Sequence, residues 1–284
     1  MPDKKIALLT DSTCDLSDEE LAEGHIHMVP LRIVYENQEY SDRVDITPQQ
    51  VYDRLTEEVP HSSLPVPEDV IRCLDGLKEQ GYTDVLNISI SSGLSGTYQM
   101  MKMMAEQYSG LTIHVYDSRT LSMGLGFLVL EAARLIEEGK DIDAIIGRLE
   151  DIRSQSQAFF VIPTLKYLRM GGRIGAVAAV LGSTLNLKPV ITVSPEGKYI
   201  TAAKVRGFQN AITRMEELFI RHFGSKPIQL AVVHGDAGEE AKTLSDRLHG
   251  TMSVIQSRLR QISPVLGVHT GPGLLGLIAY PDLP

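Results

Sequence analysis

Short apolar runs alternate with amphipathic segments along the first half of the chain, and this alternation limits the possible folds more than any other feature of the sequence. Residues Ile6–Thr10, Asp84–Ile90 and Thr112–Tyr116 have the length and composition of buried strands. Helices are predicted at Pro67–Gln80 and from about Ser95 to Gln107. Because parallel strands need helical crossovers, this order favours a largely parallel sheet in a three-layer α/β/α domain.

Several helix starts are marked by residues that cap an N-terminus. Ser17 with Glu20, and Thr47 with Gln50, are spaced as capping boxes, in which each side chain bonds to the other residue's backbone N–H. A further helix is predicted after the cap residue Asp141, because apolar residues recur there at helical spacing. Its apolar face consists of Ile142, Ile145, Ile146, Leu149 and Ile152.

The second half of the chain has more strands and fewer helices. Strands are predicted at Phe159–Ile162, Pro189–Val193, Tyr199–Val205, Ile228–His234, Ser253–Ser257, Val265–His269 and Leu274–Tyr280. Helices are predicted at Leu165–Arg173, Phe208–Phe223 and Glu239–Leu248. The turn Ser194-Pro195-Glu196-Gly197 predicts a hairpin. These features indicate an α+β domain, so we divide the chain into residues 1–155 and 156–284, with the ligand site between the two domains.

Composition narrows the class of protein. A hydrophobic content of 43% supports a large core, and a net charge of -9 argues against broad nucleic-acid binding. Cys14 and Cys73 have no metal-binding or redox spacing, which favours a reducing cytosol and a cytoplasmic protein. The uncharged stretches Ile174–Leu187 and Ile262–Tyr280 contain polar residues or prolines, so we expect buried segments and no membrane span.

The strongest local signal is Ser91-Ser92-Gly93-Leu94-Ser95-Gly96-Thr97, which joins a predicted strand to a predicted helix. A helix N-terminus offers unpaired N–H groups to an anion, glycines permit close approach, and serines add donors. On these residues alone, anion binding and plain capping by Ser95 are equally supported. Gly96 directly follows Ser95, which excludes the spacing of a serine-hydrolase elbow. No Gly-Lys-Ser/Thr phosphate loop occurs.

Other polar groups have both a structural and a functional interpretation. Ser62-Ser63 precedes a helix that starts with proline. Arg169 and Arg173 are four residues apart, and either face solvent or bind a phosphate or carboxylate. His269 is either structural or a ligand contact. Gly271–Gly276 matches a dinucleotide fingerprint by letter, but no βαβ unit follows it, and the histidines lack metal spacing. We therefore expect no metal and no cofactor.

Together these segments resemble the DegV family, and the resemblance covers nearly the whole chain. Each motif is weak alone, but their order is highly specific. The motifs are Thr10-Asp11-Ser12-Thr13, Ser62-Ser63, Ser91–Thr97, Leu168-Arg169-Met170-Gly171-Gly172-Arg173, Lys188-Pro189, Lys204-Val205-Arg206-Gly207 and His269-Thr270-Gly271-Pro272-Gly273.

The resemblance implies a two-domain protein that buries one long-chain fatty acid between its domains and presents the carboxylate to a separate ATP-dependent fatty acid kinase. Each buried methylene contributes about 0.8 kcal/mol, so a chain of about C14 to C18 can be held without a covalent bond. The anionic carboxylate needs donors, among which we include a protonated His269.

The family pattern also implies roles for individual residues. The carboxylate contacts come from Ser62, Ser95 with Gly96, and His269, with Arg169 close to this polar end; Arg173 and Arg206 are the implied kinase-docking residues.

One motif departs from the family. Members commonly have Thr-Ser-Gln-Pro-Ser where this chain has Ser62-Ser63-Leu64-Pro65-Val66. Ser62 keeps the hydroxyl needed for carboxylate binding. Leu64 and Val66 replace two polar groups, so we expect an effect on acyl-chain choice or on kinase recognition.

The leading hypothesis is therefore a carrier without catalytic residues. The residues show no nucleophile–base arrangement, and we find no nucleotide or metal ligands for phosphoryl transfer. The alternative is a small-molecule hydrolase or transferase that uses His269 and a serine. A third hypothesis is a regulatory interaction protein whose bound lipid is only structural.

Overall fold

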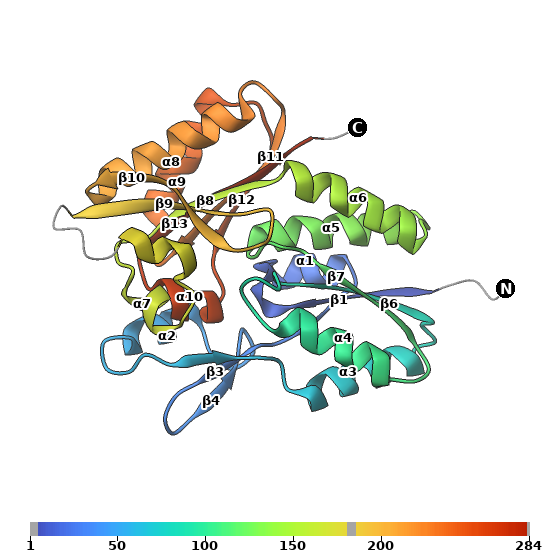
Figure 1. Cartoon of the computed structure of the whole chain (residues 1–284). Helices are drawn as coiled ribbons and strands as arrows, with labels where there is room; N and C mark the ends of the chain where they lie inside the picture. Colours follow the sequence, from blue (N-terminus) through green and yellow to red (C-terminus); the bar gives the residue numbers. More distant parts are fainter. Residues whose placement is uncertain (1–4, 181–185, 283–284) are drawn as a thin grey trace.

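The first half of the chain contains a four-stranded, all-parallel sheet, which we call the N-terminal sheet. The computed structural model describes residues 5–180 and 186–282 (Figure 1). The strand order is β2-β1-β6-β7, with β1 at Ile6–Asp11, β2 at Ile26–Val29, β6 at Asp84–Ser89 and β7 at Thr112–Asp117. Alternate residues of β1 enter two different cores, because strand side chains alternate between faces. Ala7 and Leu9 pack with α3 (Pro67–Glu79) and α4 (Thr97–Gln107).

The opposite face of this sheet packs on α5 (Met123–Glu137) and α6 (Ile142–Gln155). Leu8 contributes to that second core, together with Leu128 and Leu149. The predicted three-layer α/β/α arrangement is therefore confirmed. Figure 1 shows that α5 and α6 also lie against a second sheet, so this helical layer is shared by both halves of the molecule.

The second sheet, which we call the C-terminal sheet, has six strands in the order β10-β9-β8-β13-β11-β12. Only β11 and β12 pair in parallel; all other neighbours are antiparallel. The strands are β8 (Gln157–Val161), β9 (Leu187–Val193), β10 (Tyr199–Arg206), β11 (Ile228–Gly235), β12 (Val254–Gln261) and β13 (Leu274–Pro281). The outer face is covered by α8 (Phe208–Phe223) and α9 (Gly238–Thr251), which confirms an α+β organisation.

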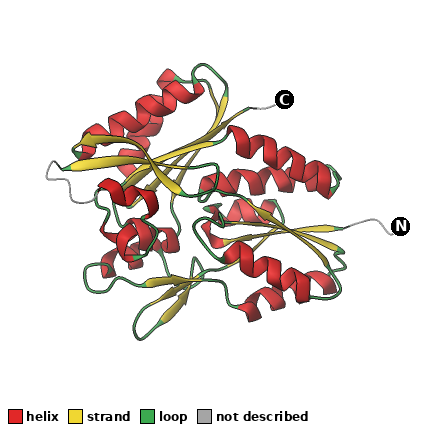
Figure 2. Ribbon diagram, in the orientation of Figure 1, coloured by secondary structure: helices red, strands yellow, loops and turns green. Residues whose placement is uncertain are grey.

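The remaining elements are a small sheet, which lies apart from the two large sheets, and several short helices (Figure 2). A small antiparallel sheet has the order β4-β3-β5, with β3 at Arg32–Val34, β4 at Glu39–Ser41 and β5 at His61–Ser63. The other helices are η1 (Ser12–Cys14), α1 (Asp18–Glu23), α2 (Pro48–Arg54), α7 (Lys166–Met170), η2 (Gly175–Val180) and α10 (Pro264–Thr270).

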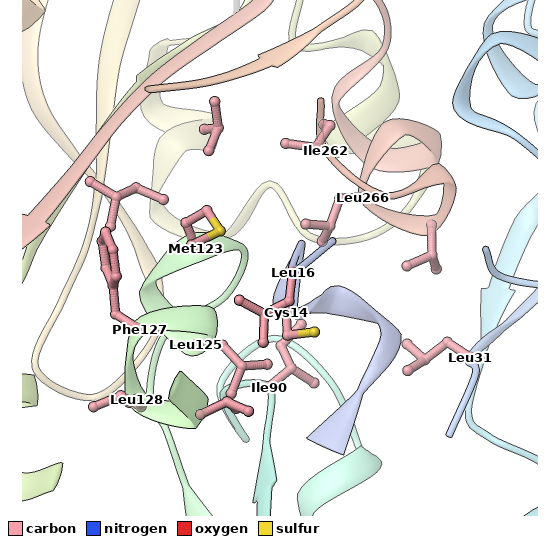
Figure 3. Close-up of a cluster of buried hydrophobic side chains, with 14 of the residues drawn as sticks. Cys14, Leu16, Leu31, Ile90, Met123, Leu125, Phe127, Leu128, Ile262 and Leu266 are labelled. Carbon is pink, nitrogen blue, oxygen red and sulfur yellow. The ribbon is translucent and has the colours of Figure 1, made fainter. Parts of the chain in front are cut away.

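One hydrophobic core joins the two halves. Figure 3 shows Cys14 of η1, Ile90 after β6 and residues of α5 in one cluster with Ile262 and Leu266, which come from the end of the chain. Because α6 ends at Gln155 and β8 opens the C-terminal sheet at Gln157, we propose the domain boundary at residues 155 and 156. The two domains thus bury apolar surface against each other rather than meeting across water.

The largest error of the sequence-based prediction is at Val265–His269, which is not a strand but helix α10. The prediction followed a continuous apolar run, and such a run does not distinguish a strand from a helix buried on every side. The missed signal is Ser263-Pro264, in which Ser263 is the N-cap and Pro264 takes the first helical position. Burial on every side also explains why no helix was predicted for α5, because its first turns are apolar all round.

No helix among residues 5–180 and 186–282 is both long and apolar enough to cross a membrane. Of the uncharged stretch Ile174–Leu187, residues 181–185 lie outside the described residues. Val177 is buried there as expected, whereas Ala176 and Ala179 are exposed. The stretch is therefore only partly a buried segment.

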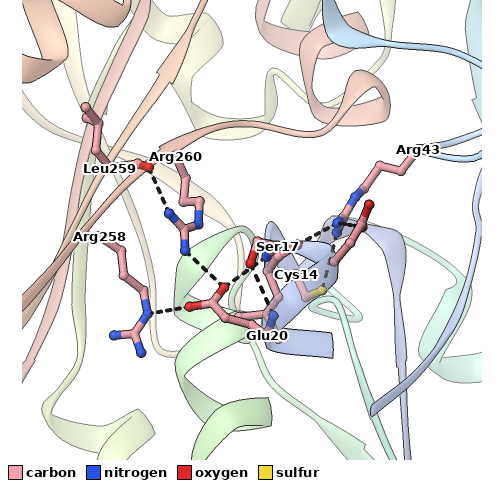
Figure 4. A network of polar contacts seen from close by, with 9 residues as sticks. Cys14, Ser17, Glu20, Arg43, Arg258, Leu259 and Arg260 are labelled. Carbon is pink, nitrogen blue, oxygen red and sulfur yellow. Dashed lines mark hydrogen bonds and ion pairs between the residues drawn. The ribbon is translucent and has the colours of Figure 1, made fainter. Parts of the chain in front are cut away.

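The predicted capping box at Ser17 also joins the two domains. Ser17 and Glu20 exchange the expected hydrogen bonds, and Glu20 in addition forms ion pairs with Arg258 and Arg260 of β12 (Figure 4). Its carboxylate accepts from Arg258 Nε at 2.8 Å and lies 3.1 Å from Arg260 Nη2. These charges and hydrogen bonds hold the pKa of the half-buried Glu20 below its usual value, against the opposing effect of burial.

Helix α10 is fixed to the N-terminal half by two buried carboxyl groups. Asp15 accepts a hydrogen bond from the backbone N–H of Ser263 at 2.8 Å, and Asp42 accepts one from that of Val265 at 2.9 Å. Both N–H groups belong to the helix N-terminus, where negative charge is favoured. Helix α10 thus lies in the C-terminal half of the sequence, but its first turn is held by residues of the N-terminal half.

A second connection joins the segment Ser91–Thr97 to the turn of the β9–β10 hairpin. Ser91 Oγ donates to the carbonyl oxygen of Gly197 at 2.8 Å. A Cβ at Gly93 would lie 2.6 Å from that same oxygen, and a Cβ at Gly197 would lie 1.9 Å from Ser91 Oγ. Gly93 therefore allows the two domains to approach closely, which is a different role from the predicted approach to an anion.

Replacing Gly93 by alanine is expected to destabilise the protein by about 1–3 kcal/mol, because the added Cβ meets backbone that has little room to move. The matched control is Gly76→Ala in α3, where nothing lies within 4 Å of the added Cβ. That change should stabilise the protein by about 0.4–1 kcal/mol. Urea unfolding measures both; equal effects of the two substitutions would contradict the close packing.

Candidate functional site

A mainly apolar cavity lies where the two domains meet. Its walls come from both large sheets, from the small sheet and from α10. The apolar lining residues are Leu31, Ile90, Leu94, Leu121, Ala158, Phe159, Phe160, Tyr199, Val233, Ile262, Val265, Leu266, Leu274, Gly276 and Ile278. The polar lining residues are Thr13, Ser62, Ser95, Ser122, Arg173, His269 and Thr270. A cavity of this kind suits a long apolar ligand with one polar group.

The N-terminal wall is the carboxyl edge of the parallel sheet. Thr13, Ile90 and Leu121 follow β1, β6 and β7 respectively, and all three line the cavity. Ligands of open α/β sheets bind at this edge because the loops after parallel strands converge there. Asp11 fixes two of these loops, since its carboxylate accepts from Thr13 and, at 2.7 Å, from the backbone N–H of Ile90.

Two predicted contact residues, Ser62 and His269, meet at one end of the cavity. His269 Nε2 lies 2.7 Å from Ser62 Oγ, although the residues are 207 positions apart. Ser62 sits on β5 and His269 near the end of α10, whose anchoring by Asp15 and Asp42 sets the position of the ring. Two residues predicted to contact the same carboxylate are thus in hydrogen-bond contact with each other.

The surroundings of His269 keep its imidazole neutral. Burial lowers the pKa of His269 to about 4, and the nearby charges of Arg173 and His61 lower it further. The predicted protonated histidine is thus incorrect at neutral pH. Its Nδ1 is buried without a hydrogen-bond partner among the described residues. A Cβ at Gly171 would lie 2.1 Å from that nitrogen, which explains why glycine stands there.

The unpartnered Nδ1 decides which tautomer of His269 fits. A buried N–H without an acceptor is rarer in proteins than an acceptor with an unused lone pair. The proton therefore belongs on Nε2, which donates to Ser62 Oγ. Ser62 then keeps its own O–H free to donate into the cavity. The pair is arranged as a hydrogen-bond donor and not as a nucleophile with its base.

The segment Ser91–Thr97 contributes Ser95 to the cavity. Ser95 precedes the helix that starts at Thr97, and its Oγ lies 3.3 Å from Thr97 N and 2.9 Å from Thr97 Oγ1. Gly96 is the N-cap, is exposed, and does not line the cavity. It lines instead an outer depression, which we call the vestibule. Ser95 therefore lines the cavity and accepts from Thr97 N, but it is not the N-cap of the helix.

The vestibule adjoins the polar end of the cavity. It is bounded by the Ser92–Gly96 segment, by residues Gly172–Ala176 and by the hairpin residues Ser194–Ile200. Leu94, Ser95, Arg173 and Tyr199 line both the vestibule and the cavity. These four residues therefore mark the boundary between the cavity and the vestibule.

The three arginines differ in their positions relative to the cavity. Arg173 lines the cavity, with its guanidinium donating to the carbonyl oxygens of Leu94 at 3.2 Å and Gly171 at 2.8 Å. Arg169, predicted beside the polar end, is exposed and lines neither the cavity nor the vestibule. Arg206 ends β10 and is exposed. The cation at the polar end is thus Arg173.

Thr13, Ser122 and Tyr199 were not predicted as site residues. Thr13 lies in the motif Thr10-Asp11-Ser12-Thr13, so the motif could have revealed it. Ser122 and Tyr199 carry no sequence signal, because only the fold brings their loop and strand to the cavity. Within residues 5–180 and 186–282, no group of histidine, cysteine, aspartate and glutamate residues could hold a metal ion.

The chain is similar to known proteins over almost its full length. The family model described as "Uncharacterised protein, DegV family" matches residues 5–282. A DegV domain-containing protein from Clostridium acetobutylicum is 40% identical over 277 residues, which are 98% of this chain and 99% of that protein.

Solved structures give the same relationship. A DegV family protein from Thermus thermophilus, described by its fatty acid binding, matches with a TM-score of 0.89 and 32% identity, over 98% of this chain and 100% of that one. A stearic acid-binding protein from Eubacterium ventriosum matches with a TM-score of 0.84 and 27% identity, over 98% of each chain. By its sequence and its two-domain fold, this chain belongs to the DegV family.

Proposed function

We propose that this protein binds one long-chain fatty acid in the cavity between its domains. The observation that carries the proposal is the distribution of polar groups: the cavity is apolar over most of its wall, whereas Ser62, Ser95, Arg173 and His269 gather at the end beside the vestibule. An acyl chain gains about 0.8 kcal/mol for each methylene removed from water, and its carboxylate needs donors at one end only.

Each group at the polar end has a distinct part in this proposal. Ser62 donates its O–H to the carboxylate, and His269 fixes the Ser62 hydroxyl by donating from Nε2. Ser95 adds a second hydroxyl. Arg173 supplies a permanent positive charge, whereas His269 is neutral at pH 7 before a carboxylate is bound. Structural relatives from Thermus thermophilus and Eubacterium ventriosum, described as binding fatty acid and stearic acid, support a ligand of this class.

We further propose that the protein is a non-catalytic carrier that presents its ligand to a separate ATP-dependent fatty acid kinase. The vestibule supports this role, since it opens next to the carboxylate end. Leu64, which lies on Gly96 at the vestibule, would shape the surface offered to the kinase. Exposed Arg206 is the proposed docking residue, and Arg173 serves the carboxylate first. Two free cysteines, Cys14 and Cys73, are consistent with a cytoplasmic location.

A hydrolase or transferase remains the second candidate, because Ser62 and His269 are in hydrogen-bond contact. A serine nucleophile requires a histidine base whose Nδ1 is oriented by a third group. His269 has no such partner among the described residues, and its pKa of about 4 makes it a weak base. Turnover of acyl esters by the purified protein alone would favour this candidate over the carrier.

Protein purified from cells is expected to contain a co-purifying fatty acid of about C14 to C18, at about one molecule per chain, because the cavity wall is mainly apolar. Native mass spectrometry followed by extraction identifies the acid. If no acid is present, and none is taken up on incubation with palmitate or stearate, the proposed ligand is wrong.

Ser62→Ala and Ser95→Ala are each expected to weaken fatty-acid binding roughly 10- to 100-fold, because a hydrogen bond to a charged group is worth about 1.5–3 kcal/mol. The matched control is Ser63→Ala on the same strand, whose side chain is exposed and outside the cavity. Fluorescence titration with cis-parinaric acid measures affinity. Equal affinities of Ser62→Ala and Ser63→Ala would place the carboxylate elsewhere.

Arg206→Glu is expected to leave acyl binding unchanged and to lower acyl-phosphate formation by the partner kinase by about tenfold or more, because a charge reversal in a docking surface slows association. The control is Arg221→Glu, an exposed arginine at the end of α8. Kinase assays with ATP and loaded carrier compare the two variants. An equal effect of the two substitutions would show that Arg206 is not part of the docking surface.

A further inference from the structure

Three buried carboxyl groups lie immediately behind the cavity wall. We call Asp11, Asp15 and Asp42 the acidic shell; none of them lines the cavity, and their exposed fractions are 0%, 4% and 0%. Each accepts a hydrogen bond from a residue that does line it. These cavity-lining partners are Thr13 and Ile90 for Asp11, Ser122 for Asp15 and Val265 for Asp42.

The acidic shell has little direct charge compensation. The other ionisable groups around it are Cys14 of η1, Arg43 after β4, Tyr52 of α2, Asp236 after β11 and Arg260 of β12. Arg43 acts on Asp15 and Asp42 from a distance, while its guanidinium forms its ion pair with exposed Asp18. Arg260 forms its ion pair with Glu20.

Burial therefore dominates the titration of the shell. It raises the pKa of Asp15 to about 6 and that of Asp42 to about 7. Hydrogen bonds oppose the rise, from Ser122 and Ser263 at Asp15 and from Ser12 and Val265 at Asp42. Burial raises the pKa of Asp11 as well. Near neutral pH, Asp15 and Asp42 are thus poised between their charged and neutral forms.

We propose that filling the cavity with an acyl chain makes the acidic shell take up protons, so that the protein binds its ligand more tightly as pH falls. The inference rests on the proposed ligand class. An acyl chain in the cavity excludes water from the cavity side of Ser122 and Val265, which keeps the dielectric beside the carboxyls low and favours their protonated form. Linkage then requires that affinity rise as pH falls through the range in which protons are taken up.

The acidic shell acts on the cavity through helix α10, which carries His269. Asp15 and Asp42 hold the N-terminal turn of α10, and Val265 and His269 of the same helix line the cavity. Protonation keeps each carboxyl oxygen as an acceptor for its backbone N–H while removing a buried charge. A carrier built in this way retains its ligand in acidified cytosol and releases it more readily at higher pH.

The test uses cis-parinaryl alcohol, a neutral polyene whose fluorescence reports entry into an apolar site and which has no titrating group. Its dissociation constant is expected to fall about 3- to 10-fold from pH 8 to pH 6. His269 stays neutral over this range, since its pKa is about 4. Calorimetry at pH 7 in two buffers of different ionisation enthalpy should show uptake of about 0.3–1 proton per ligand.

Asn at position 42 keeps an acceptor for Val265 N but cannot titrate, so Asp42→Asn should lose at least half of the proton uptake and flatten the pH dependence. Asp53→Asn, on the exposed face of α2, is the matched control and should behave as the wild type. The double variant Asp15→Asn/Asp42→Asn should show almost no pH dependence. An unchanged slope in that variant would overturn the proposal.

The wild-type protein alone also tests the inference, should the variants fail to fold. Proton uptake measured at pH 5, where the shell is already protonated, should fall well below that at pH 7. The inference would be overturned if proton uptake were zero at both pH values and the alcohol bound with equal affinity from pH 6 to pH 8. That result would not contradict the proposed ligand class. Failure of both cis-parinaric acid and the alcohol to bind at any pH would overturn the proposed function instead.

Discussion

The anchoring of helix α10 by Asp15 and Asp42 is the contact on which the rest of the structure depends. These carboxyl groups come from the first 42 residues, and the N–H groups that they accept belong to Ser263 and Val265. A seven-residue helix has too few internal hydrogen bonds to hold its own position, so outside partners must fix it. Once α10 is placed, its apolar side closes the cavity and His269 reaches Ser62.

The site is therefore a product of the interface rather than of either domain. The N-terminal half supplies Ser62, Ser95 and the sheet edge, whereas the C-terminal half supplies Arg173 and His269. Close approach of the two domains is possible because Gly93 stands against the backbone of the hairpin, and Gly171 leaves room for the imidazole of His269 within the C-terminal half. Buried apolar surface on both sides of α5 and α6 keeps the two sheets together (Figures 1 and 3).

Electrostatics distinguish the two ends of the cavity. At the polar end, Arg173 is the cation and His269 is neutral, because burial beside a guanidinium disfavours a second positive charge. This arrangement suits a carboxylate that is held by hydroxyl donors and one charge. Behind the apolar wall, Asp11, Asp15 and Asp42 are buried with few cations, so the protein keeps titratable groups close to the space that a ligand would fill.

The sequence by itself determined the parallel sheet, most helices, the capping boxes at Ser17 and Thr47, and the family, because these depend on local periodicity, capping chemistry and an ordered set of motifs. It did not reveal that Val265–His269 is helical, since a fully buried segment has no amphipathic period. It also placed Arg169 rather than Arg173 beside the polar end. Only the tertiary structure decided that Arg173 is the cation at the polar end and that His269 is neutral. Both depend on burial, on the 2.7 Å contact with Ser62 and on the nearby guanidinium, and these bring together residues that are far apart in the chain.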